Sequence, residues 1–131
     1  MIEGACHCGR VVWRFDGMPD SSTACNCTVC RRYGTLWAYD FDGERIRVGG
    51  PTRAYTRGDG DLGFYFCENC GVIAYWRGIK PRADGRTRIA VNLRLALNPD
   101  QVAAIPIRHF DGLTTWTDLP EDGRTVKDMW F

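Results

Sequence analysis

The chain has 131 residues, a length that fits one small domain, and we expect a single domain over residues 1–131. Hydrophobic residues make up 44% of it and charged residues 25%, as in an ordinary globular protein. The 17 basic and 16 acidic residues are interspersed and give a net charge of +1. Because nucleic-acid-binding proteins usually carry a basic excess or stripe, we expect no nucleic-acid partner.

Nothing at the N-terminus predicts export. Residues 1–6 have neither the basic region nor the apolar region of a secretory signal. No apolar run approaches the ~18 residues that a membrane-spanning helix needs, so we also expect no membrane partner. The expected location is cytoplasmic, where thiols stay reduced. Seven cysteines cannot all form pairs, and in a reducing compartment such a density favours metal ligands over disulfides.

Short apolar runs separated by turn residues occur along most of the chain and predict an all-β fold with little helix. Strands are expected at 10–15, 36–39, 45–48, 53–56, 63–66, 72–76 and 87–97, of which the last would be the longest. Turns are expected at 17–22 and 58–61.

Two short helical segments are predicted between these strands. One is a helical turn over 31–34 that Gly34 ends. The other covers 98–104, with Asn98 as N-cap and Pro99 at the first helical position. The mixed tail over 107–131 closes with Trp130 and Phe131, which we expect to pack against the body of the domain.

Two cysteine pairs predict a structural zinc site. In an extended segment Cys6 and Cys8 point to the same face, because side chains alternate along a strand. Cys67 and Cys70 lie between two strand-like runs, where a hairpin tip would direct both sulfurs inward. Four thiolates make a closed tetrahedral site, and we expect this zinc ion to join the N-terminus to the hairpin.

Cys25, Cys27 and Cys30 are left over, close enough in sequence to share a second zinc ion. Three protein ligands leave one coordination position free, as in catalytic zinc sites. With three thiolates the core has a net charge of −1, which disfavours hydroxide formation but suits an exchangeable thiolate. We therefore hypothesise that an external thiol binds there as thiolate and reacts with a carbonyl group.

Other arrangements of these residues are also possible. His7, His109 or an acidic side chain could fill the open position and close the second site, although His7 would point to the opposite face of a strand from its neighbours. A redox role for Cys67 and Cys70 would require a βαβ context, which the sequence does not indicate. Iron–sulfur ligation fits this cysteine spacing less well.

Three cysteine blocks in this order resemble the glutathione-dependent formaldehyde-activating enzyme family, also called the centromere protein V/GFA domain. The resemblance is carried by residues 4–9, 25–32 and 66–71, with further similarity at 91–94 and 109–112. It implies a β-tent fold with one structural zinc at the outer pairs and a reactive zinc held by Cys25, Cys27 and Cys30. It also implies a carbon–sulfur lyase that reversibly adds glutathione to formaldehyde, giving S-hydroxymethylglutathione.

Side chains that could contact a substrate are two arginines, three aromatic residues and one histidine, namely Arg31, Arg32, Trp37, Tyr39, Trp76 and His109. The arginines could bind a carboxylate, the aromatic rings could form a pocket wall, and the histidine could transfer a proton. Solvent-exposed arginines and core aromatic residues are the competing interpretations. The alternative function is a non-catalytic binding or scaffold module with two structural zinc ions.

Overall fold

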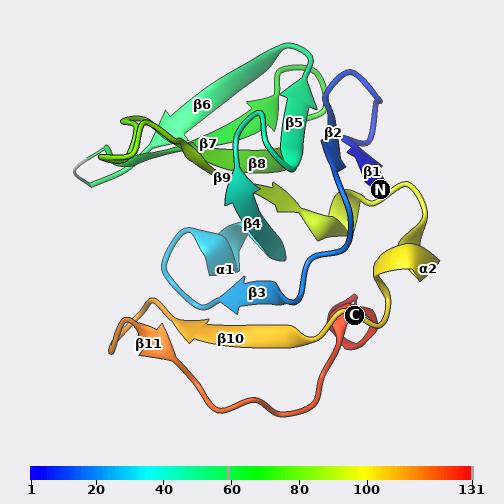
Figure 1. The fold of residues 1–131 in the computed structure, drawn as a ribbon, viewed down its shortest axis with the longest axis vertical. Helices are drawn as coiled ribbons and strands as arrows, with labels where there is room; N and C mark the ends of the chain where they lie inside the picture. Colours follow the sequence, from blue (N-terminus) through cyan, green and yellow to red (C-terminus); the bar gives the residue numbers. More distant parts are fainter. Residues whose placement is uncertain (59, 131) are drawn as a thin grey trace.

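Eleven strands form two sheets in the computed structural model, which describes residues 1–58 and 60–130 (Figure 1). The strands are β1 (Ile2–Ala5), β2 (Val12–Phe15), β3 (Ser22–Cys25), β4 (Trp37–Phe41), β5 (Ile46–Gly49), β6 (Thr52–Thr56), β7 (Leu62–Cys67), β8 (Ile73–Gly78), β9 (Arg88–Asn92), β10 (Ile107–Asp111) and β11 (Thr117–Asp118). One sheet has the order β1-β2-β5 and the other the order β11-β10-β3-β4-β9-β8-β7-β6. The all-β prediction is confirmed.

Helical segments in the described residues are short. They are α1 (Cys30–Tyr33), α2 (Pro99–Val102) and two 3₁₀ turns, η1 (Leu93–Leu95) and η2 (Val126–Met129). Gly34 ends α1 with φ 66°, as predicted, and the side chain of Asn98 accepts a hydrogen bond from the backbone N–H of Asp100 at the start of α2. None of these helices has the length and apolarity that a membrane crossing requires.

The predicted hairpin around the third cysteine block is present. β7 and β8 pair antiparallel, with Tyr65 opposite Tyr75; Cys67 is the last residue of β7, and Cys70 lies in the connection between the two strands. The Cys67 N–H donates to Val72 O at 3.1 Å, and the Gly71 N–H donates to Cys67 O at 2.9 Å. This tight connection explains why both sulfurs can face one point.

The expectation of one long strand over 87–97 is wrong. β9 ends at Asn92, and the 3₁₀ turn η1 follows directly. The Asn92 side chain caps this turn by accepting from the Arg94 N–H at 3.2 Å, and its oxygen also accepts from the Leu36 N–H at 3.3 Å. A side chain that bonds neighbouring backbone groups in this way competes with strand continuation.

The C-terminal segment builds one edge of the long sheet. β10 lies parallel to β3 and pairs Phe110 with Cys25, while the other strand pairings in the two sheets are antiparallel (Figure 1). Trp130 packs against the main hydrophobic core, in line with the expectation for the tail. Phe131, and Asp59 within the predicted turn at 58–61, lie outside the described residues.

Candidate metal centres

The sulfurs of Cys6, Cys8, Cys67 and Cys70 lie within 4.8 Å of one another, and we call these residues the four-sulfur group. Cys6 Sγ and Cys8 Sγ are 3.7 Å apart, and Cys8 Sγ and Cys67 Sγ are 3.6 Å apart. A tetrahedron of sulfurs about 2.3 Å from a zinc ion has edges of about 3.8 Å. The donor set and its spacing therefore fit a zinc ion with four thiolate ligands.

Backbone and side-chain N–H groups surround the four-sulfur group. The Val11 N–H donates to Cys6 Sγ at 3.3 Å, and the Asn69 N–H donates to Cys67 Sγ at 3.4 Å. A hydrogen bond from the Asn69 side chain is the largest influence that lowers the pKa of Cys8, to about 6. Sulfurs that are stabilised as thiolates in this way are ready metal ligands.

Cys25, Cys27 and Cys30 form a second cluster, the three-sulfur group, whose sulfurs also lie within 4.8 Å of one another. Cys25 is the last residue of β3 and Cys30 the first of α1, so the group spans one strand-to-helix connection. The Cys27 N–H donates to Cys25 Sγ at 3.4 Å, and the Cys30 N–H donates to Cys27 Sγ at 3.3 Å. The buried indole of Trp37 adds a third bond, from Nε1 to Cys30 Sγ at 3.3 Å.

The sulfurs of the three-sulfur group differ in acidity. A hydrogen bond from Cys30 is the largest influence on Cys25 and lowers the pKa of Cys25 to about 6. The pKa of Cys30 is raised, because its thiol donates to Cys25 and is buried. The backbone N–H of Gly112 also donates to Cys25. A thiolate with several N–H donors keeps less charge on sulfur, which leaves a bound metal more electrophilic.

The two groups differ in the number of ligands that they offer. Within residues 1–58 and 60–130, no other histidine, cysteine, aspartate or glutamate places a ligand atom in the three-sulfur group. Of the candidates for a fourth ligand, His7 is exposed and belongs to neither group. His109 instead places Nε2 3.1 Å from an Asp122 carboxylate oxygen. A metal ion in the three-sulfur group would therefore keep a coordination position for an outside ligand.

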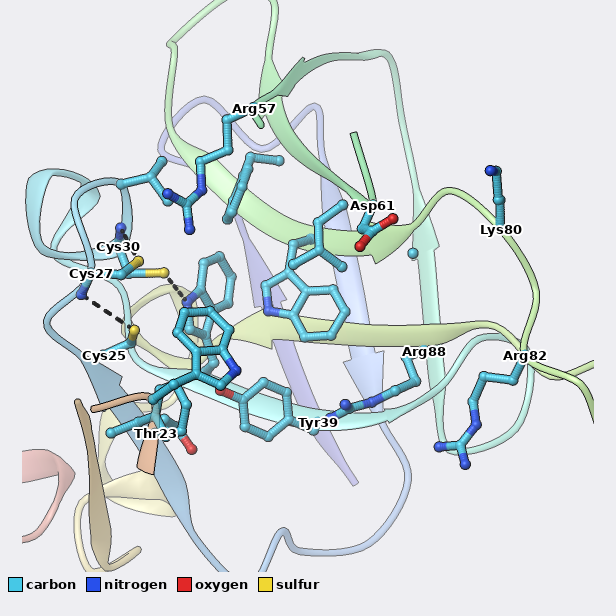
Figure 2. Close-up of a pocket in the computed structure, with 18 residues that line it drawn as sticks. Thr23, Cys25, Cys27, Cys30, Tyr39, Arg57, Asp61, Lys80, Arg82 and Arg88 are labelled. Atoms are coloured by element: carbon cyan, nitrogen blue, oxygen red, sulfur yellow. Dashed lines mark hydrogen bonds between the residues drawn. The ribbon is translucent and has the colours of Figure 1, made fainter. Parts of the chain in front are cut away.

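A hollow of about 450 Å³ adjoins the three-sulfur group (Figure 2). Trp37, Tyr39 and Trp76, for which the sequence left both a pocket wall and the core open, are among its lining residues, and Trp37 and Trp76 also belong to a buried hydrophobic cluster. The Tyr39 ring packs at 5.7 Å from the Trp76 ring, and its hydroxyl points toward the cysteines and is hydrogen-bonded to Thr23. Burial raises the pKa of Tyr39 to about 12, so this hydroxyl remains a proton donor at neutral pH.

Four cations line the same hollow, and none of them forms an ion pair with a carboxylate in the described part of the chain; they are Arg57, Lys80, Arg82 and Arg88. Lys80, Arg82 and Arg88 lie on the side opposite the cysteines (Figure 2). The Arg88 guanidinium lies 5.6 Å from the Tyr39 ring centroid. This arrangement suits a ligand with an apolar part and an anionic end.

The two arginines that the sequence suggested for binding a substrate carboxylate lie outside the hollow. Arg31 and Arg32 are exposed and do not line the hollow. Arg32 Nη1 donates to the backbone oxygen of Thr28 at 2.7 Å. Among the cations of the hollow, Arg57 directly follows β6, Lys80 and Arg82 lie in the connection between β8 and β9, and Arg88 begins β9. No local motif marks them.

The sequence pattern of the family described as "glutathione-dependent formaldehyde-activating enzyme" (GFA) matches residues 1–106, which include all seven cysteines. The chain belongs to this family. A crystal structure of a Rhodobacter sphaeroides protein has the same fold, with a TM-score of 0.60 and 24% sequence identity. The alignment covers 80% of this chain and 98% of that one. A comparison with curated proteins gave no match.

Beyond the range of the GFA match, residues 110–116 complete the surroundings of the three-sulfur group. The Asn26 side chain, which sits between two of the cysteines, donates from Nδ2 to Asp111 Oδ1 at 3.0 Å. Its own oxygen accepts from the Leu113 N–H at 3.0 Å. The Asp111 carboxylate is further bonded by Thr115, and these bonds, led by that from Asn26, lower the pKa of Asp111 to about 2.

Proposed function

We propose that this GFA-family chain is a zinc-dependent enzyme of the carbon–sulfur lyase type. It adds a thiol such as glutathione to a small aldehyde, or catalyses the reverse reaction. The observation that supports this proposal is the three-sulfur group, which offers three ligands and borders a hollow large enough for a substrate. Open coordination beside a pocket is typical of catalytic zinc, whereas a site with four protein ligands is typical of structural zinc.

The two groups would then have separate roles. Cys6, Cys8, Cys67 and Cys70 would hold a structural zinc ion that joins the N-terminus to the β7–β8 hairpin. Cys25, Cys27 and Cys30 would hold the second zinc ion, which supplies a position where a substrate thiol is kept as its thiolate. The chain would thus bind two zinc ions.

The reaction itself is a nucleophilic addition. A bond forms between the substrate sulfur and the carbonyl carbon, the carbonyl π bond breaks, and the oxygen takes up the proton that the thiol released. The N–H donors from Trp37, Cys27 and Cys30 draw charge away from the ligand sulfurs. The hollow holds the two reactants next to each other, which lowers the entropic part of the barrier.

The lining also favours an acidic thiol. Arg57, Lys80, Arg82 and Arg88 border the hollow, and arginine pairs well with carboxylates because its planar donors match them. Glutathione carries two carboxylates and a reactive thiol. A thiol of this class would place its sulfur at the cysteines and its charges near these cations.

Metal analysis combined with thiol titration tests the proposal. The wild-type protein should contain two zinc equivalents, and Cys27→Ser should reduce this toward one while the protein stays folded, as measured by elemental analysis and circular dichroism. The cobalt-substituted wild-type protein should change its visible spectrum when glutathione is added, and it should consume formaldehyde in the presence of glutathione. A single bound zinc would leave only a zinc-stabilised scaffold, and two zinc ions with a cobalt spectrum insensitive to thiols would favour the non-catalytic binding module.

A further inference from the structure

One residue beside the hollow has an unfavourable backbone conformation. Trp116 has φ 56° and is the single non-glycine residue with positive φ in the described part of the chain. Bulky side chains rarely adopt this left-handed region, because it costs free energy, and residues strained in this way cluster at active sites and ligand-binding positions. The Trp116 side chain is 65% exposed, so burial in the core does not compensate for this cost.

The conformation is held by the turn over residues 111–116, which we call the closing turn. The Trp116 N–H donates to Asp111 O at 2.7 Å. The Asp111 carboxylate accepts from the backbone N–H groups of Thr114 and Thr115 at 3.2 and 3.1 Å. The Trp116 ring also packs edge-on against Phe110, with centroids 5.2 Å apart. The fold thus presents an indole to solvent in one defined position.

That position is next to the three-sulfur group. Trp116 is one of the lining residues of the hollow. A Cβ atom added to Gly112 would lie 2.8 Å from Cys25 Sγ and 3.5 Å from Trp116 Cζ3, so the sulfur and the indole flank the same point. An outside ligand that reaches the three-sulfur group would therefore pass beside the Trp116 ring.

Building on the proposed function, we propose that Trp116 is a substrate-contacting residue that covers the bound thiol. The substrate class is an organic thiol whose sulfur and adjacent methylene group lie against the indole. Sulfur and aliphatic groups make favourable contacts with aromatic rings, and a ring in this place also excludes water from the reacting atoms. Burial of the indole by the substrate would then offset the cost of the strained backbone.

The test separates the ring from the backbone conformation through three variants, Trp116→Ala, Trp116→Gly and Trp116→Phe. Thiol affinity is measured by titrating glutathione and 2-mercaptoethanol into the cobalt-substituted proteins, and stability by the thermal midpoint. Trp116→Ala and Trp116→Gly should bind both thiols about tenfold more weakly, the order of effect of truncating an aromatic contact residue. Trp116→Phe should retain most of the affinity.

Stability should follow a different order from affinity. Trp116→Gly should have a higher thermal midpoint than Trp116→Ala, because glycine adopts positive φ without strain. Leu119→Ala is the matched control: it removes an exposed apolar side chain from the same C-terminal segment, outside the lining of the hollow, and should leave thiol affinity unchanged.

Two results would overturn the inference while the proposed function stands. In the first, the wild-type protein responds to thiols and Trp116→Ala binds them equally well. In the second, thiol affinity follows the thermal midpoint across the variants, so that Trp116 acts only through the fold. If the wild-type cobalt protein shows no response to either thiol, the proposed function is rejected, and this inference with it.

Discussion

Replacing Gly112 with alanine should weaken metal binding by the three-sulfur group and leave the four-sulfur group intact. Gly112 lies directly after β10, and its backbone N–H donates to Cys25. The backbone can approach the sulfurs this closely because glycine has no side chain. The substitution therefore perturbs the ligand positions without removing any ligand.

The size of the effect can be worked out from distances. The new Cβ atom would lie 2.8 Å from both Cys25 Sγ and Cys27 Cβ. Non-bonded carbon contacts are normally about 3.5–4.0 Å, so the turn or the cysteines must shift by roughly 0.7 Å or more. Metal sites tolerate deviations of about 0.2 Å in ligand distance. We expect the affinity for the second metal ion to fall about 10- to 100-fold, as when other groups that orient ligands are altered.

Competition with a chromophoric zinc chelator measures both sites in one titration. Gly112→Ala should release one of two zinc equivalents at a lower chelator concentration than the wild-type protein and the other at an unchanged concentration. Gly49→Ala is the control, because its Cβ would meet Val12 Cγ2 at an ordinary 3.7 Å and its φ is not positive. If Gly112→Ala keeps both zinc ions with wild-type affinity, the close approach of this turn to the ligands is not the constraint that we describe.

Three further changes test other parts of the site. Cys67→Ser should unfold the chain, which circular dichroism would detect, because the four-sulfur group joins the N-terminus to the β7–β8 hairpin; a folded variant with one zinc would contradict this. Trp37→Phe removes the N–H donor to Cys30, so in the cobalt-substituted protein it should shift the sulfur-to-cobalt charge-transfer band to lower energy. It should also lower the free energy of unfolding by on the order of 2 kcal/mol. An unshifted band would argue against the hydrogen bond from Trp37 to Cys30. Asp111→Asn should weaken zinc binding at the second site severalfold, and the loss of affinity should be the same at pH 6 and pH 9. A folded-state pKa of about 2 keeps the Asp111 carboxylate charged at both pH values. The contribution of this carboxylate is lost only as the pH falls from about 4 toward 2. A difference in zinc affinity that changes between pH 6 and pH 9 would show that another group is involved.

Local features of the sequence predicted much of the structure. The Cys-x-Cys and Cys-x-x-Cys spacings indicated the three-sulfur group and each half of the four-sulfur group, because ligands a few residues apart depend only on local backbone geometry. That the two halves share one metal was inferred from the number of ligands that a closed zinc site needs. The β7–β8 hairpin and the cap of α2 followed from turn and capping residues in the same way. The strand expected over 87–97 was wrong because the Asn92 side chain caps η1 at Arg94 and also accepts a hydrogen bond from Leu36, a contact between distant residues that periodicity does not reveal.

The remaining parts of the site depend on contacts between distant segments. Asp111 reaches Asn26 across 85 positions because β10 pairs in parallel with β3, and nothing in either segment predicts that pairing. In the sequence nothing distinguishes Trp116 from an ordinary loop residue, and only the positive φ of its backbone sets it apart. The cations of the hollow are likewise placed by sheet order, while the more conspicuous Arg31 and Arg32 next to the cysteines do not line it.

The difference in locality between the two sulfur groups also explains why they suit different tasks. The four-sulfur group draws its ligands from two distant segments, so a metal ion there would hold the fold together and would have every position filled by protein. The three-sulfur group comes from a single connection of six residues, which leaves the fold free to build the fourth side from other elements. Those elements supply Trp116, Tyr39 and a set of cations in place of a ligand. A site whose fourth side is a lined hollow, rather than a side chain, has the features expected for binding a substrate.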